Sequence, residues 1–273
     1  MTDRPAESLV AAADAAVAAT ANRIVLVEHD GVRYIAKRTA DRPRRLSQAL
    51  FVRWLVKRVT GESLPLKTLL LSAAVNGVEH EAGRLRSLAE AGVRVPRVVH
   101  QDRGYLLLEH CGPTVESLLG GWDRDARADE LRAEAEALGA FHRAGHWHGA
   151  AQVKNLTRRD GHGWRIDFEE DFGERVPLPA AQALDLVLLL NSVSLGGPVD
   201  EAEARGLMPV LLDAYFAAHP DPQLRQALVR ALPWASALMR LASPFKGGSV
   251  RGRPRKGVAR LEIVVDALAA RLG

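Results

Sequence analysis

The sequence predicts an α+β protein of two lobes, a small strand-bearing lobe followed by a mostly helical one. The runs RIVLVEH and VRYIAKR have the composition of strands, and the Asp-Gly pair between them suits a tight hairpin turn. In the second half of the chain, apolar residues recur at helical spacing. Gly112 and Pro113 break the chain between these two patterns. We therefore expect lobes of residues 1–111 and 112–273.

Composition and charge limit the classes of function. The chain has 273 residues, of which 47% are hydrophobic, enough to bury a substantial core. Its apolar runs are shorter than the about 20 residues of a membrane span, and no signal segment opens the chain. The single cysteine, Cys111, cannot form an internal disulfide, so we expect a cytoplasmic protein. The net charge of +4 favours anionic partners, but without a nucleic-acid-binding signature we expect no nucleic-acid partner.

The elements of the first lobe can be predicted in chain order. We expect an alanine-rich helix in the first twenty residues, the strand hairpin, a basic amphipathic helix at 44–59, a helix from Val75 to Ala91 ended by Gly92, and short strands ending in YLLLEH.

The second lobe follows the break at Gly112 and Pro113. The spacing of its apolar residues predicts a helix from about Asp125 to Ala144, followed by the polar loop HWHGAAQVKN and a strand ending in RIDF. The remainder, from Ala180 to Gly273, is expected to be all-helical.

Lys37 and Glu81 are the first candidate site residues. Strand alternation places Ile35 and Lys37 on one face of the sheet, so the ammonium group lies on an apolar side and needs an anion. Glu81 shares a helix side with Leu85 and Leu88, so its carboxylate needs a cation. Pairing Lys37 with Glu81 meets both needs. The alternative is that both side chains extend to solvent.

Asn155 and Asp167 are candidate metal ligands. Asn155 closes the polar loop, and Asp167 follows twelve residues later in RIDFEED. An amide oxygen and a carboxylate that converge on a hard cation commonly hold a phosphate-bound magnesium ion. The alternative is that Asn155 caps the loop and Asp167 ends the strand.

Six sequence blocks together resemble the protein-kinase-like superfamily, in particular its small bacterial members, the lipopolysaccharide (Kdo) kinase and RIO-like groups. The blocks are VRYIAKR, HEAGRLRSLAEAGVRVPRVV, LLLEHCGPT, LGAFHRAGHWHGAAQVKN, RIDFEE and ALDLVLLL, and they span about residues 23 to 190. The resemblance implies a two-lobed kinase-like fold, ATP and Mg²⁺ as cofactors, and a hydroxyl of a small molecule or envelope sugar as phosphate acceptor.

The resemblance also implies roles for individual residues. Lys37 would bind the α- and β-phosphates, and Glu81 would orient Lys37. Residues 108 to 111, including Glu109 and Cys111, would form the adenine hinge. Asn155 and Asp167 would hold Mg²⁺. Asp185, on a later helix, would brace the catalytic loop.

Three departures from the family pattern bear on catalysis. The pattern His-x-Asp, followed five positions later by Asn, places Ala150 where the Asp that orients the acceptor hydroxyl belongs. No glycine-rich phosphate loop precedes Lys37, and Glu169 follows Asp-Phe where a glycine is usual, as in choline-kinase-like groups. Four residues could replace the missing base, and the sequence does not choose among them: Gln152, His148, Glu169 and Glu170.

Two basic segments have uncertain roles. The helix at 44–59 carries Phe51 and Trp54, so it would either rest on an anionic membrane or sugar lipid, or pack on the small lobe with its charges solvated. We expect the second basic cluster, near the C-terminus, to form a flexible turn with its charges solvated. Its members are Lys246, Arg251, Arg253, Arg255, Lys256 and Arg260.

Two functions therefore remain open. The first is an ATP- and magnesium-dependent phosphotransferase, and the second is a pseudokinase that serves as a regulatory or partner-binding module, for which Ala150 is the direct evidence. A third hypothesis, a helical nucleic-acid- or membrane-binding adaptor, requires the order of the blocks to be coincidental.

Overall fold

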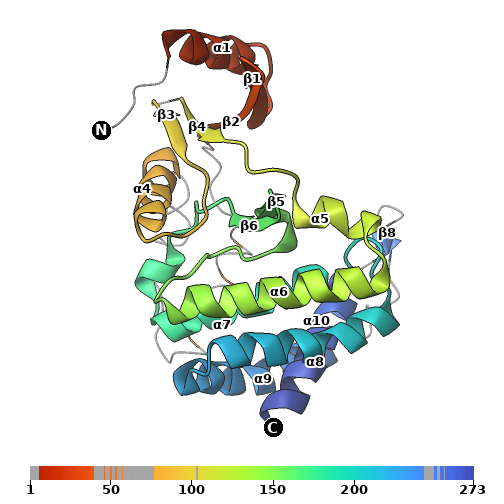
Figure 1. Cartoon of the computed structure of the whole chain (residues 1–273). Coiled ribbons are helices and arrows are strands. Elements are labelled where there is room, and N and C mark those ends of the chain that lie inside the picture. Colours follow the sequence, from red (N-terminus) through yellow and green to blue (C-terminus); the bar gives the residue numbers. More distant parts are fainter. Residues whose placement is uncertain are drawn as a thin grey trace.

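The computed structural model describes residues 6–39, 46, 50, 53, 57, 65, 77–102, 104–242, 249–250, 253–254 and 256–273. A small sheet lies at one end of the molecule between helices α1 and α4, and a stack of long helices lies at the other end (Figure 1). The predicted α+β architecture, with a small strand-bearing lobe and a mostly helical lobe, is confirmed. No helix in the described part of the chain is long and apolar enough to cross a bilayer.

The small lobe is built on a four-stranded antiparallel sheet with the order β1-β2-β4-β3. Its turn between the first two strands is the predicted one, because Asp30 and Gly31 both have positive φ angles, of 50° and 73°. The four strands are β1 (Ile24–His29), β2 (Val32–Arg38), β3 (Val98–Gln101) and β4 (Tyr105–Glu109).

The two faces of this sheet pack against different partners. Helix α1 (Glu7–Ala18) buries Leu9 and Ala13 on the face that carries Ala36 and Leu107. The opposite face carries Lys37, which pairs in register with Ile24 and with a buried leucine of β4. Because residues opposite each other in a sheet point to the same side, the predicted alternation around Lys37 is confirmed.

Helix α4 (Gly77–Glu90) forms the other wall of the small lobe. Glu81, Leu85 and Leu88 are all buried, as the predicted helical stripe requires. Gly92, with a φ of 79°, ends the helix at the predicted place because glycine adopts this left-handed conformation without steric cost. Helix α4 thus turns the Glu81 carboxylate inward, toward the sheet.

The second lobe is mostly helical, and its long helices lie side by side in Figure 1. Helix α6 begins at the predicted position because the side chain of Asp123 accepts a hydrogen bond of 2.8 Å from the Ala126 amide. The elements are α5 (Val115–Leu118), η1 (Leu119–Gly121), α6 (Arg124–Arg143), η2 (Val153–Asn155), β5 (Leu156–Arg159), β6 (His162–Arg165), η3 (Phe172–Arg175), α7 (Leu178–Val193), α8 (Glu201–Ala218), α9 (Pro222–Ala242), β7 (Ser249–Val250), β8 (Arg253–Pro254) and α10 (Lys256–Leu272).

The connection between the sheet and the helical lobe passes very close to strand β5. A side chain at Gly112 would place its Cβ 1.9 Å from the carbonyl oxygen of Arg158, and Gly112 has a φ of 88°. The Arg158 amide donates to the Pro113 carbonyl at 3.0 Å. Only glycine fits this crossing, which gives the Gly-Pro break its physical reason.

Two details of the predicted second lobe were wrong. The strand before the acidic segment ends at Arg165, the first residue of RIDF, and does not continue to Phe168, because Asp167 has a φ of 69°, which a strand cannot contain. The segment after Ala180 is not all-helical, because β7 and β8 form a short antiparallel pair.

Most of the two basic segments lies outside the described residues. This holds for most of the helix predicted at 44–59, including Phe51 and Trp54, and for much of the C-terminal cluster. Arg260 departs from the predicted solvated turn, because it lies in α10 and donates to the Leu195 carbonyl at 2.9 Å.

Candidate active site

Lys37 is the centre of the candidate site. It lies near the end of β2, and only 6% of its surface is exposed. Its ammonium nitrogen is 2.9 Å and 2.8 Å from the two carboxylate oxygens of Glu81. The structure therefore brings together the two residues whose pairing the sequence predicted.

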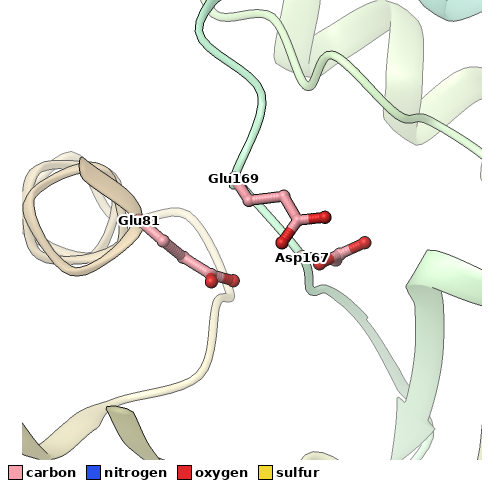
Figure 2. A group of neighbouring side chains, drawn as sticks. All are labelled: Glu81, Asp167 and Glu169. Atoms are coloured by element: carbon pink, nitrogen blue, oxygen red, sulfur yellow. The ribbon is translucent and has the colours of Figure 1, made fainter. Parts of the chain in front are cut away.

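Two further carboxylates reach Lys37 from the segment that follows β6. The ammonium group donates to Asp167 and lies 3.3 Å from Glu169. Figure 2 shows Glu81 extending from helix α4 toward Asp167 and Glu169 on the facing segment. Burial would lower the pKa of Lys37, but the three carboxylates outweigh it and raise that pKa, so the side chain remains charged.

The carboxylates around Lys37 form a set of hard oxygen donors. Within the part of the chain that the structure describes, oxygens of Glu81, Asp167 and Glu169 lie within 4.8 Å of one another. Carboxylate oxygens are the ligands that Mg²⁺ prefers, so the donor chemistry fits this ion. Burial would raise the pKa of Asp167, but Lys37 lowers it, so Asp167 presents an ionised oxygen.

Asn155 lies next to this set through the backbone. The Ile166 amide donates to the Asn155 carbonyl at 3.0 Å, which brings the end of the polar loop beside the residue that precedes Asp167. The side-chain amide of Asn155 donates to the Ala150 carbonyl at 2.9 Å, which leaves its amide oxygen as the atom that could bind a cation. The two predicted metal ligands are thus neighbours.

Asp185 of helix α7 holds the polar loop from inside the helical lobe. Its carboxylate accepts hydrogen bonds from the amides of His148, at 2.5 Å, and Gly149, at 2.8 Å, and it lies 3.4 Å from His142 Nε2. Burial would raise the pKa of Asp185, but these contacts lower it, so the buried carboxylate stays ionised. The resemblance predicted this contact between helix and loop.

Ala150 occupies the position where the family pattern has a carboxylate, and two of its possible replacements can be judged from the structure. His148 is fully buried and stacks on Phe168 with ring centroids 4.3 Å apart; burial lowers its pKa to about 4. It therefore lies inside the loop, away from any acceptor. Gln152 is half-buried, and no hydrogen bond among the described residues joins its side chain to Lys37 or to the carboxylates.

Arg84 is a functional candidate that the sequence did not reveal. It lies on α4 three residues after Glu81, and its guanidinium donates to the carbonyls of Trp147 (2.6 Å), His148 (3.2 Å) and Glu170 (3.0 Å). It also stacks 3.9 Å from the Trp147 ring centre, and burial lowers its pKa to about 10. This one side chain ties α4 to the polar loop. In the sequence, it is one of the two arginines in GRLRS.

The predicted hinge residues are placed at the end of β4. The Glu109 amide donates to the Arg97 carbonyl at 3.0 Å, and its carboxylate pairs with Arg159 at 2.5 Å, so both groups have partners within the protein. The buried Cys111 thiol lies 3.7 Å from the Glu109 carbonyl, and burial raises its pKa to about 12. The thiol therefore serves packing and not chemistry.

An exposed apolar strip of the sheet lies beside Lys37. Ile24 and Leu26 of β1 are 49% and 50% exposed. Their register partners on β2 are Lys37 and Ile35, so all four side chains share one face. A flat apolar ligand group could lie on this strip while its charged end reaches Lys37.

Comparisons with known proteins complete the description of the site. No protein-family model and no curated protein sequence matches the chain. The structure is similar to WaaP in complex with acyl carrier protein, at 18% identity over 82% of this chain and 86% of that chain, with a TM-score of 0.42. It is also similar to the choline kinase LicA from Streptococcus pneumoniae, at 14% identity over 92% and 91% of the two chains, with a TM-score of 0.37.

Proposed function

We propose that this chain is an ATP- and magnesium-dependent phosphotransferase with a protein-kinase-like fold. The observation that carries the proposal is the buried Lys37, held by Glu81 at 2.8 Å and in contact with Asp167 from the other lobe. In kinase-like phosphoryl transfer, a lysine paired with a helix glutamate binds the nucleotide phosphates, and an aspartate holds the metal ion. Here these three residue types meet at one point.

Each group would contribute a separate part of the reaction. Lys37, oriented by Glu81, would bind the α- and β-phosphates, and Asp167 and Asn155 would hold Mg²⁺. When bound, the ion would neutralise the charge that develops on the transferred phosphoryl group. The strip of Ile24 and Leu26 would receive the base.

The acceptor and the location of the protein are finer parts of the same proposal. We infer that the acceptor is a hydroxyl of a small molecule or of an envelope sugar of the lipopolysaccharide-core type, a class that rests on the sequence resemblance alone. A cytoplasmic location would supply ATP to this site. A screen of such hydroxyl compounds for ATP consumption by the purified protein tests the acceptor class.

Asp167→Asn tests the metal site of the proposed function. Wild-type protein is expected to gain thermal stability on addition of ATP with Mg²⁺, because a ligand that binds only the folded state stabilises it. Asp167→Asn keeps the shape of the side chain but removes its charge, so most of that gain should be lost. Differential scanning fluorimetry with ATP, with and without Mg²⁺, measures both effects. If the variant gains as much thermal stability from ATP with Mg²⁺ as the wild type does, Asp167 does not hold the metal ion.

A pseudokinase is the second candidate, and the specific observation that favours it is Ala150. The position lies in the polar loop, directly after the amides of His148 and Gly149 that Asp185 holds in place. The loop is therefore ordered as in a working site, but it carries no carboxylate at the position that orients an acceptor. Such a protein would bind nucleotide without transferring its phosphate.

Ala150→Asp separates the two candidates. If the chain is a slow enzyme, restoring the carboxylate should raise phosphate release from ATP by about 100-fold or more, the usual contribution of a positioned base. Binding of ATP should change little, because position 150 does not contact Lys37. The measurement is ATP hydrolysis by the two proteins at saturating ATP, with the Asp167→Asn variant as the inactive control. If the wild type and Ala150→Asp both hydrolyse ATP no faster than Asp167→Asn, the pseudokinase is favoured.

A further inference from the structure

Arg23 stands beside Lys37, although the sequence marks it only as the first residue of the strand-like run RIVLVEH. It directly precedes β1, and its carbonyl accepts a hydrogen bond of 2.9 Å from the amide of Arg38, the residue after Lys37. Its guanidinium reaches across to the other lobe and donates to Glu169. Arg23 thus connects the start of the sheet with the acidic segment after β6.

Arg23 and Lys37 converge on the same atom. Both bind Oε2 of Glu169, Arg23 through a short hydrogen bond and Lys37 at 3.3 Å. Two cations aimed at one oxygen form a site that can also accept an oxygen of a phosphate group, because guanidinium and ammonium groups bind carboxylates and phosphates alike. The Arg23 side chain is 42% exposed, so a ligand that enters from solvent can reach it.

The charged groups around Arg23 and Lys37 favour binding of an anion only if a metal ion binds together with it. Burial would lower the pKa of Arg23, but Glu169 and the carboxylates of Asp167 and Glu81 raise it, so the guanidinium is charged. By formal charge the two cations face three carboxylates, a net charge of −1, although burial raises the pKa of Glu81. Bound Mg²⁺ would offset these carboxylates, and a phosphate oxygen would then take the place of the Glu169 oxygen beside Arg23 and Lys37.

We propose that Arg23 is a nucleotide-binding residue that holds the outer phosphates together with Lys37. This inference rests on the proposed function. In kinases, a glycine-rich loop covers the β- and γ-phosphates with its backbone amides. No such loop precedes Lys37 in this chain, so another group has to bind these phosphates. In this chain, helix α1 precedes β1, and Arg23 is the first residue after it that reaches the site. A side-chain cation thus replaces the backbone amides.

The test compares Arg23→Ala with Glu169→Gln. Binding of ATP, ADP and AMP, each with Mg²⁺, is measured by isothermal titration calorimetry. If Arg23 binds phosphate, Arg23→Ala weakens ATP binding by about tenfold or more, the effect of losing one charged hydrogen bond, and weakens AMP binding much less. Glu169→Gln breaks the same contact between the lobes but removes no cation, so it should not weaken ATP binding more than AMP binding.

The opposite pattern would overturn the inference. If Arg23 only ties the lobes together through Glu169, the two substitutions weaken binding equally, and ATP and AMP are affected alike. Arg132→Ala on α6 is the matched control, since it removes an arginine that is 49% exposed and remote from the site, and it should change nothing. If Lys37→Ala abolishes ATP binding but Arg23→Ala does not weaken it, the inference fails and the proposed function stands. If the wild-type protein binds no nucleotide, both fail.

Discussion

Replacing Lys37 with alanine is expected to abolish binding of ATP with Mg²⁺. The substitution removes the cation at the centre of the site, to which Glu81, Asp167 and Glu169 are all bound. Three carboxylates left without their lysine repel the phosphates, so affinity should fall by about 100-fold or more. Isothermal titration calorimetry with wild-type and variant protein measures the change. Lys154→Ala, which removes an exposed lysine of the helical lobe, is the control.

The same substitution should also weaken the fold, and a double variant separates the two effects. Glu81 is only 2% exposed, so without Lys37 its carboxylate is left buried and unpaired, at a cost of about 3–5 kcal/mol. Combining Lys37→Met with Glu81→Gln removes both charges and should restore most of the free energy of unfolding. Nucleotide binding should stay absent. If the double variant binds ATP with wild-type affinity, Lys37 does not bind phosphate.

Asp185→Ala is expected to cause a large loss of stability. Asp185 is fully buried and accepts from the amides of His148 and Gly149. Its removal leaves two buried N–H groups without acceptors, so the free energy of unfolding should fall by about 3–5 kcal/mol. Urea denaturation followed by circular dichroism measures the change.

Two further variants control this result. Asp213→Ala removes a carboxylate of α8 that is 60% exposed and paired with Arg271 at 2.6 Å, and should cost less than about 1 kcal/mol. Asp185→Asn keeps one acceptor oxygen, so its loss in free energy of unfolding should lie between those of Asp185→Ala and Asp213→Ala. A loss for Asp185→Ala no greater than that for Asp213→Ala would mean that the loop is held by other contacts.

The parts of the fold that the sequence predicted are those with strong local signals. The Asp30-Gly31 turn requires positive φ angles that few other residue pairs allow, so the hairpin could be placed. Glu81 and Leu85 recur at the helical period, so the buried side of α4 and its need for a cation could be deduced. In both cases neighbouring residues alone determine the conformation.

The parts that could not be predicted depend on residues far apart in the chain. Arg23 and Glu169 are separated by 146 positions, and nothing in the sequence around Arg23 indicates that the two side chains meet. Arg84 donates to carbonyls 63 to 86 positions away, and backbone carbonyls leave no trace in a sequence pattern. The early end of β6 goes with the positive φ of Asp167, a conformation for which strand propensity has no signal.

Helix α1 sets a practical limit on how far the chain can be shortened. Arg38, the neighbour of Lys37, donates to the carbonyl groups of Val17 and Thr20 at the end of this helix. A fragment beginning at β1 would leave that guanidinium without these acceptors and would uncover Leu107 and Ala36 on the outer side of the sheet. Expression of the ligand-binding lobe alone therefore has to start upstream of α1. Helix α1 packs on the face of the sheet opposite Lys37, so it supports the site from behind.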